Sequence, residues 1–340
     1  MTRTIWTRIC LWAATVAVAI AVQMLYAAPG DSMFWGVVFD AGHAPLFGVV
    51  ALAFLQGLLL FPWTRSLPRP WIYAAALALA IGSGGMAEFG QHFGPRDADP
   101  QDLARDALGA MSALLAAYGI DRRATKTLRG LRIPRAAFAG AALLVLVPVI
   151  LPVARITYDL LQRDRAFPEI CEFNSAWEGR FLHLSHATLE RVPPPPGWVR
   201  EERDRDAQPA GSGPRGAGDL VAHLTFYAAA YPALLITEPH PDWSGYDRLA
   251  FDVYSELPVP IRLALRIHDT HHERAYSDRF NLSFTIQPGV NAVAIDLSQV
   301  EHAPRGRLMD MQHIHNVTLF AVRPAESISL YLDSFRLERD

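Results

Sequence analysis

The first half of the chain is dominated by long apolar runs that carry few charges. Each run approaches the roughly 20 helical residues that cross a hydrocarbon core of about 30 Å. One run, 103–120, is charged in its first turn, and its small residues Gly109, Ala113 and Ala117 recur every four positions, which lets membrane helices pack closely. The pattern predicts an all-α transmembrane helical bundle with five spans, at about 9–28, 41–63, 71–90, 103–120 and 136–154.

In the second half, apolar and polar residues alternate over short stretches. Side chains of a strand point alternately to its two faces, so this period of two is typical of strands with one buried face. Turn-forming Pro, Gly, Asn and Asp separate the stretches. We therefore predict an all-β jelly-roll sandwich, whose strands include 249–253, 261–267, 280–286, 293–297, 317–321 and 328–332.

The two patterns predict a multi-domain chain. The transmembrane domain covers 1–156, a charged stalk covers 157–167, and the sandwich covers 168–340. Within the sandwich, the polar stretch 200–219 is typical of a long loop. Only 19% of the residues are charged and 51% are hydrophobic, which excludes a single ordinary soluble domain.

Charge divides the chain in the same place. Residues 1–156 hold 13 basic and 8 acidic side chains, a net charge of +5, whereas the remainder holds 18 and 26, a net charge of −8. The acidic half would be repelled by phosphate, so we expect no nucleic acid as a partner. Membrane lipids are the expected partners of the apolar half.

Basic residues mark the cytoplasmic ends of membrane spans. They cluster before the first span, between the second and third, and between the fourth and fifth. We therefore place the amino terminus in the cytoplasm and the sandwich outside the plasma membrane, which leaves Cys10 and Cys171 on opposite sides. An alternative for residues 1–28 is a cleaved signal peptide, although the bulky Tyr26 favours retention.

Polar residues collect at the outer ends of the predicted spans. Pairs such as Asp40 and His43 are three positions apart and share a helix face. His43 offers acid–base chemistry and Arg96 can hold a phosphate. Three interpretations stay open, namely mutual neutralisation of charges, binding of an envelope molecule, and catalysis. The candidate residues are Asp40, His43, Glu88, Gln91, Arg96, Asp99, Asp102 and Asp106.

These residues belong to one ordered series: Asp40, His43, Glu88, Gln91, Phe93, Pro95, Arg96, Asp99, Asp102, Asp106 and Gly109. The series resembles the VanZ-like family of bacterial membrane proteins, named for a teicoplanin-resistance protein, over about residues 9–150. The resemblance implies a multi-span protein of the bacterial inner membrane, linked in some members to glycopeptide susceptibility, without an agreed reaction. This chain departs from the family in having Ala41 in place of Lys and Asp106 in place of Asn.

The second half carries a resemblance of its own. The runs 242–253, 266–269, 278–280, 288–291, 295–297 and 330–337, which open on Asp242-Trp243-Ser244-Gly245-Tyr246, look like a galactose-binding-like or carbohydrate-binding-module jelly roll. The resemblance covers about residues 168–340 and implies recognition of a glycan without hydrolysis. Folds of this kind serve many functions, so it supports architecture more than activity.

Sugars stack on aromatic rings and bond to polar side chains. The candidate glycan-binding residues are Tyr276, Arg279, His271 and Trp243, although Trp243 also fits a core position. A structural calcium is a further hypothesis, with Glu172 and Asp333 as oxygen ligands. Zinc is less favoured, because His268, His271 and His272 fall in a predicted loop.

Three functions follow from these residues. We favour a membrane protein that interacts with a cell-envelope glycan or lipid-linked glycan. The first alternative is a membrane enzyme acting on a phosphate- or sugar-linked lipid at the outer leaflet, which is less favoured because the helical half has no nucleophile or metal motif. The second alternative is a lipid or small-molecule transporter, which would require charges at the midplane of the membrane.

Overall fold

The computed structural model describes residues 7, 10, 12–14, 17–18, 30, 32–91, 99–127, 134–198 and 220–340. The chain divides into two compact units, Met1–Thr157 and Tyr158–Asp340. The first predicted span, 9–28, and the predicted loop 200–219 fall almost wholly outside the described residues.

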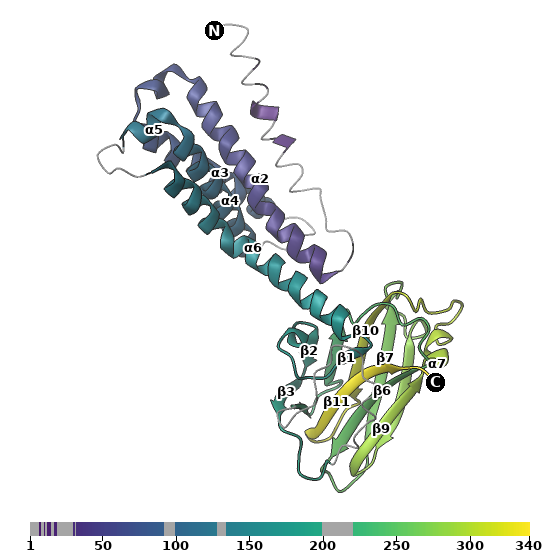
Figure 1. Cartoon of the computed structure of the whole chain (residues 1–340). Helices are drawn as coiled ribbons and strands as arrows, with labels where there is room; N and C mark the ends of the chain where they lie inside the picture. Colours follow the sequence, from purple (N-terminus) through teal and green to yellow (C-terminus); the bar gives the residue numbers. More distant parts are fainter. Residues whose placement is uncertain are drawn as a thin grey trace. The chain divides into compact units, whose positions relative to one another are not determined.

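The first unit is helical (Figure 1). Its elements are α2 (Met33–Leu60), the short 3-10 helix η1 (Pro62–Ser66), α3 (Arg69–Gln91), α4 (Pro100–Ile120), α5 (Arg122–Thr127) and most of α6 (Arg135–Ala166), whose residues from Tyr158 onward belong to the second unit. Among the described residues, three helices are long and apolar enough to cross a membrane, namely Met33–Leu60, Arg69–Phe89 and Arg135–Ala166. These helices indicate membrane association, but the prediction of five spans is not supported.

The fourth predicted span forms a helix that is too polar to count as a candidate span. Asp99 caps α4 by accepting a hydrogen bond from the backbone of Gln101 at 2.9 Å, and Pro100 follows at the first helical position. The first two turns then carry Asp102, Arg105 and Asp106. Charges therefore occupy the amino-terminal end of a helix whose remainder is mostly alanine, leucine and glycine.

Two helices extend beyond the predicted membrane spans, because α2 begins before the second span and α6 continues after the fifth. The connection predicted at 29–40 is helical from Met33 onward, so Asp40 lies within α2 and does not begin it. The predicted stalk, 157–167, is helical as far as Ala166, where α6 ends. Residues 33–39 read MFWGVVF and continue the apolar run of α2, whereas the acidic residues after Thr157 alternate with Leu, Gln and Arg, which are good helix formers.

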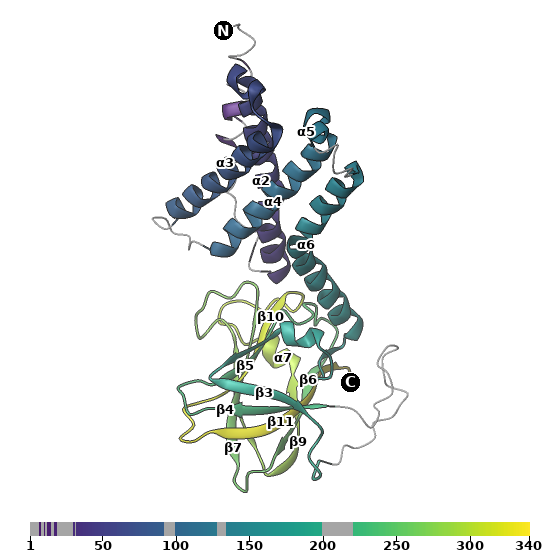
Figure 2. The ribbon, with the colours of Figure 1, turned by 90° about the vertical axis from the view of Figure 1, so that its left-hand side faces the viewer.

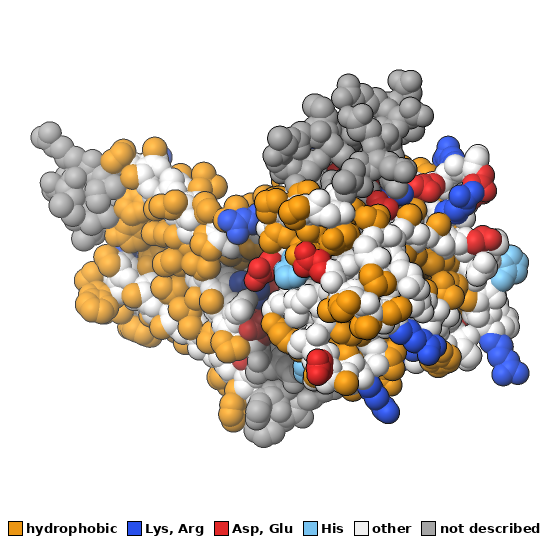
Figure 3. All heavy atoms as spheres, turned by 90° about the horizontal axis from the view of Figure 1, so that it is seen from below, with side chains coloured by type: hydrophobic (Ala, Val, Ile, Leu, Met, Phe, Trp, Pro, Cys, Tyr) orange, Lys and Arg blue, Asp and Glu red, His pale blue; other side chains and the backbone are white. Residues whose placement is uncertain are grey.

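Small residues allow α2 and α4 to pack in close contact. A Cβ atom at Gly109 would lie 2.0 Å from the carbonyl oxygen of Ala44. A Cβ atom at Gly48 would lie 3.3 Å from the Cβ atom of Ala113. On the outside of the unit, Leu143 and Leu144 of α6 are 68% and 71% exposed. On the face seen in Figure 3, hydrophobic side chains cover much of the described helical unit, as expected for helices in lipid.

The second unit is a sandwich of two antiparallel sheets (Figure 2). Its strands are β1 (Glu169–Cys171), β2 (Leu182–Ser185), β3 (Ala187–Val192), β4 (Val221–Phe226), β5 (Ala233–Thr237), β6 (Arg248–Ser255), β7 (Ile261–Asp269), β8 (Phe280–Ile286), β9 (Gly289–Asp296), β10 (Ile314–Ala321) and β11 (Ile328–Glu338). The helices η3 (Trp177–Arg180) and α7 (Leu297–Glu301) lie between strands. All six strands predicted from alternation are confirmed.

The sheets enclose one hydrophobic core. One sheet has the order β3-β4-β11-β6-β9, with β1 also paired to β11, and the other has the order β2-β5-β10-β7-β8. Core side chains come from both sheets, for example Phe251 and Leu330 from the first and Leu263 and Val317 from the second. Consequently each strand also presents alternate side chains on the outer face of its sheet.

Candidate functional site

The outer face of the five-stranded sheet is the first candidate site. On β7, Leu263, Leu265 and Ile267 belong to the core. The residues that alternate with them, among them Arg266 and His268, therefore point outward. Strand register extends this outward row over all five strands, in the order His183, Leu235, Thr318, Arg266 and Asn281.

Two polar side chains in the middle of this row, those of Arg266 and Thr318, are linked by a hydrogen bond. Arg266 Nη2 donates to Thr318 Oγ1 at 3.3 Å, and Thr318 Oγ1 donates to Asn316 Oδ1 at 2.6 Å. Thr318 is 2% exposed on the middle strand, whereas His183 and Asn281 on the edge strands are more accessible. The row thus forms an ordered polar floor with open positions at both edges.

An aromatic pair lies at one end of this face. Phe320 is two residues beyond Thr318 on β10, and the rings of Phe320 and Tyr231 meet edge to face with centroids 6.3 Å apart. Tyr231 is 54% exposed. An exposed ring beside hydrogen-bonding groups is the combination that holds a sugar, because the ring covers the sugar's apolar face.

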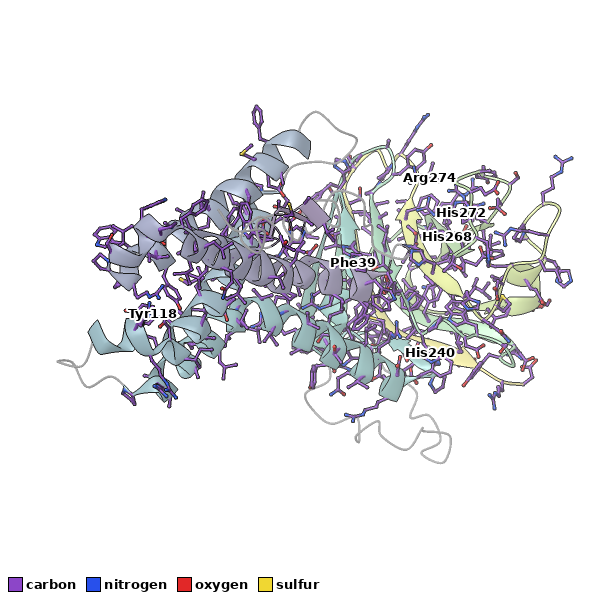
Figure 4. All side chains as sticks on the ribbon, turned by 90° about the horizontal axis from the view of Figure 1, so that it is seen from above. Phe39, Tyr118, His240, His268, His272 and Arg274 are labelled. Atoms are coloured by element: carbon purple, nitrogen blue, oxygen red, sulfur yellow. The ribbon has the colours of Figure 1, made fainter. Side chains whose placement is uncertain are left out.

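Histidines gather toward the other end. The rings of His268 and His272 are 4.6 Å apart, and that of His315 lies 5.8 Å from His268. Figure 4 labels His268 and His272 side by side. Burial lowers the pKa of His268 to about 4, and the neighbouring His272, His315 and Arg266 favour the neutral form further. At neutral pH, His268 is an uncharged hydrogen-bonding group.

This histidine gives the sandwich a specific sensitivity to acid. The pKa of His268 is below the ordinary value of 6.5, so the unfolded chain binds the proton more tightly and folding stability falls as the pH drops from 6.5 to about 4. We expect the melting temperature of His268→Gln to fall less over this window than that of the wild type, by a few degrees. Thermal unfolding at pH 7, 5.5 and 4.5 measures the difference, and parallel curves would contradict the shifted pKa.

Three of the four predicted glycan-binding residues are at least partly exposed, and the fourth, Trp243, is buried. Tyr276, which is 73% exposed, lies with its ring centroid 5.2 Å from the guanidinium carbon of Arg279. His271 is exposed and lies 3.8 Å from Asp310. Trp243 is a fully buried core residue, and its indole Nε1 donates a hydrogen bond to the carbonyl of His240.

The residues of the zinc and calcium hypotheses lie on or beside strands of the sandwich. His268 lies on β7, opposite Asn316, and not in the predicted loop. Asp333 is 3% exposed on β11, and Glu172 follows β1. In the described ranges, no group of three or more His, Cys, Asp or Glu side chains is arranged to hold a metal ion. The calcium site stays a prediction.

The second candidate site is the polar cluster of the helical unit. His43 of α2 lies between two carboxylates of α4, with Nδ1 2.9 Å from Asp106 Oδ1 and Nε2 3.6 Å from Asp102 Oδ2. Asp106 is fully buried. The pairing follows from the helical spacing of Asp102 and Asp106, which places both carboxylates on the face of α4 that meets α2.

Arg105 is the cation of this cluster, and it was not among the predicted site residues. Its guanidinium lies 3.1 Å from Asp40, 2.5 Å from Asp102 and 3.9 Å from Asp99. The sequence held a signal for this role, because Arg105 follows Asp102 by three positions at a helix start. The predicted Arg96 and the side chain of Gln91 lie outside the described residues.

Two buried oxygens of this cluster have no hydrogen-bond partner within the described part of the chain. Glu88 accepts a hydrogen bond from the backbone of Asp99 through Oε2 at 3.1 Å, but its Oε1 has none, and neither has Asp106 Oδ2. Unpaired buried oxygens are costly, so a proton or a cation is favoured here. The arrangement suits holding a proton better than holding an anion.

Comparisons with known proteins give likenesses at the level of structure alone. No protein-family model matches the chain, and no curated protein matches it. A family 11 carbohydrate-binding module from Clostridium thermocellum, in complex with a β-1,3-1,4-mixed-linked tetrasaccharide, is 12% identical with a TM-score of 0.36, covering 50% of this chain and 94% of that chain. An exo-β-agarase is 15% identical with a TM-score of 0.37, covering 51% of this chain and 25% of that chain.

A family 30 carbohydrate-binding module of a Clostridium thermocellum cellulosomal cellulase is 16% identical, with a TM-score of 0.28, covering 37% of this chain and 78% of that chain. At such TM-scores these likenesses establish neither a ligand nor a shared function. The resemblance of residues 9–150 to the VanZ-like family likewise stays a prediction, because no family model supports it.

Proposed function

We propose that this chain is a membrane-anchored glycan-binding protein of the bacterial cell envelope. The helical unit fixes the protein in the plasma membrane, and the sandwich binds a sugar chain on the outer face of its five-stranded sheet. The observation that carries the proposal is the outward row from His183 to Asn281, with the aromatic pair Tyr231 and Phe320 beside it.

The chemistry of this face fits a sugar. The row offers donors and acceptors from four residue types, and one floor position, Thr318, is already fixed by hydrogen bonds to Arg266 and Asn316. A preorganised face costs less entropy on binding than a mobile one. The exposed ring of Tyr231 adds an apolar surface that a sugar ring can cover.

The location follows from the distribution of basic residues. In the proposed topology, the arginine-rich connections around residues 64–70 and 121–135 face the cytoplasm, and the sandwich faces the outside. In this proposal the sandwich meets envelope glycans or lipid-linked glycans. A VanZ-like role in glycopeptide susceptibility would be a further consequence of such contacts.

An enzyme acting on a phosphate-linked lipid has less support. The described helical cluster holds five carboxylates, against one arginine and one histidine: Asp40, Glu88, Asp99, Asp102, Asp106, Arg105 and His43. Such an excess of negative charge repels a phosphate. The same excess leaves catalysis of phosphate transfer without the cation that would stabilise its transition state.

Binding of soluble glycans to the whole chain tests the proposal. The protein is placed in phosphatidylcholine nanodiscs, and its affinity for mixed-linkage β-glucan, dextran, dextran sulfate and polygalacturonate is measured by calorimetry. We expect at least one of them to bind, and Tyr231→Ala to weaken that binding roughly 5-fold, since stacking on a ring contributes about 1 kcal/mol.

Tyr227→Ala is the matched control, because Tyr227 is 45% exposed and follows β4 of the other sheet. Its affinity should equal that of the wild type. Binding of none of the four glycans, or equal losses in the two variants, would count against the five-stranded sheet as a glycan-binding face.

A further inference from the structure

Two arginines on the outer face of the five-stranded sheet have no acidic partner among the described residues. Arg266 lies on β7 opposite Asn281, and Arg279 precedes Asn281 by two residues. Phe280 belongs to the core, so Arg279 shares the outward direction of Asn281. The two arginines are then diagonal neighbours, with backbones roughly 7–8 Å apart.

No residue that the structure describes neutralises either guanidinium. In the described part of the chain, neither Arg266 nor Arg279 forms an ion pair, and the Nε atom of each is buried without a hydrogen-bond partner. Burial lowers the pKa of Arg266, and the charge of Arg279 lowers it further. Two cations side by side and partly withdrawn from water are electrostatically unfavourable unless an anion joins them.

Two carboxylates near this end of the sheet, those of Asp269 and Asp278, are paired with another arginine. Asp269 follows on β7 and Asp278 directly precedes Arg279, but both accept hydrogen bonds from Arg307, at 2.9 Å and 2.6 Å. His268, the histidine of β7, is neutral at pH 7 because burial lowers its pKa. The positive charge of Arg266 and Arg279 thus stays available to a ligand.

The net charge of the whole domain would not attract polyanions. Residues 157–340 carry 18 basic and 26 acidic side chains, so the domain as a whole is acidic. An anion would be repelled by most of its surface and attracted only locally. A pair of unneutralised arginines on an acidic domain therefore marks a specific position.

We propose that the sandwich selects an acidic glycan, whose carboxylate or sulfate group binds between Arg266 and Arg279 while its sugar ring lies along the face toward Tyr231. The guanidinium fork suits such groups because it can donate two parallel hydrogen bonds to one anion. This inference rests on the proposed function, and it names the ligand class for the same face.

Matched pairs of glycans that differ in charge test it. The whole chain in phosphatidylcholine nanodiscs, which present no net charge and no sugar, is titrated with dextran and dextran sulfate, and with methyl-esterified and free polygalacturonate. We expect the charged member of at least one pair to bind roughly 10- to 100-fold more tightly, as hydrogen bonds to charged groups would give. Sulfate and carboxylate are distinguished by which pair shows the difference.

Three variants locate the effect. Arg266→Gln and Arg279→Gln should each remove roughly 10-fold or more of the preference for the charged member. Arg248→Gln makes the same change of charge on β6 of the other sheet, at an arginine paired with Asp340, and should leave the preference within about 2-fold. Arg279 precedes β8, so its variant remains informative if Arg266→Gln does not fold.

The outcomes separate the two proposals. Equal affinity for charged and neutral members, with the loss in Tyr231→Ala retained, would overturn the acidic ligand and leave a neutral glycan-binding face. A preference for charge that survives in both arginine variants would overturn the site. Absence of binding to every probe would overturn glycan binding itself.

Discussion

Replacing Arg307 with alanine is expected to lower the free energy of unfolding of the sandwich by roughly 3–5 kcal/mol. Arg307 holds Asp269, which is 1% exposed, through Nη2 at 2.9 Å, and it also holds Asp278 through Nε at 2.6 Å. Without the guanidinium, Asp269 keeps one hydrogen bond, from the backbone of Asp310. A buried carboxylate is then left without a counter-charge.

Amide hydrogen exchange of peptides from β7 and β10 measures this loss within the sandwich, independently of the helices. Arg248→Ala is the control, because Arg248 pairs with Asp340 on the surface and should cost no more than about 1 kcal/mol. A second change, Asp269→Asn, should restore part of the stability of Arg307→Ala by removing the buried charge. Similar losses in the two single variants would contradict this account.

Alternation in the sequence predicts the strands that have one face in the core. The six predicted stretches correspond to β6 through β11, where apolar residues such as Leu263, Leu265 and Ile267 alternate with polar ones. The strands β1 to β5 were not predicted. β5 reads Ala-Leu-Leu-Ile-Thr, so its apolar residues are continuous, and β2 and β3 are short strands at sheet edges, where packing constrains the sequence weakly.

The site on the sandwich could be predicted only in part, because it depends on register. Tyr276 and Arg279 were chosen as an aromatic ring and a polar group that suit a sugar, and the structure places the two side chains in contact. Arg266, Thr318 and His183 come from three strands far apart in the sequence. No periodicity within one strand indicates which residues of another strand lie opposite.

In the helical unit, spacing predicts which residues share a face but not which helices meet. Asp102 and Asp106 are on one face, as expected, yet their partner is His43 and the neutralising cation is Arg105. From the sequence alone, Arg105 was only one of the charged residues at the start of the fourth predicted span. Its role follows from the packing of α4 against α2, which the stripe of small residues makes possible.

That close packing leads to the second prediction, that Gly109→Ala destabilises the helical unit by roughly 3 kcal/mol or more. The added Cβ atom would lie 2.0 Å from the carbonyl oxygen of Ala44 and 2.4 Å from its Cα atom. These are backbone atoms, which no change of rotamer can move aside. α2 and α4 must therefore separate, and the contact between His43 and Asp106 is lost with them.

The protein in detergent, heated in steps and analysed by size-exclusion chromatography, gives the midpoint of unfolding for each variant. Gly85→Ala is the matched control, since a Cβ atom at Gly85 of α3 meets no atom within 4 Å. Alanine favours helix over glycine by about 1 kcal/mol, so this variant should melt at or above the wild-type temperature. If Gly109→Ala melted with the control, α2 and α4 would not be in backbone contact, and the geometry around His43 would require another explanation.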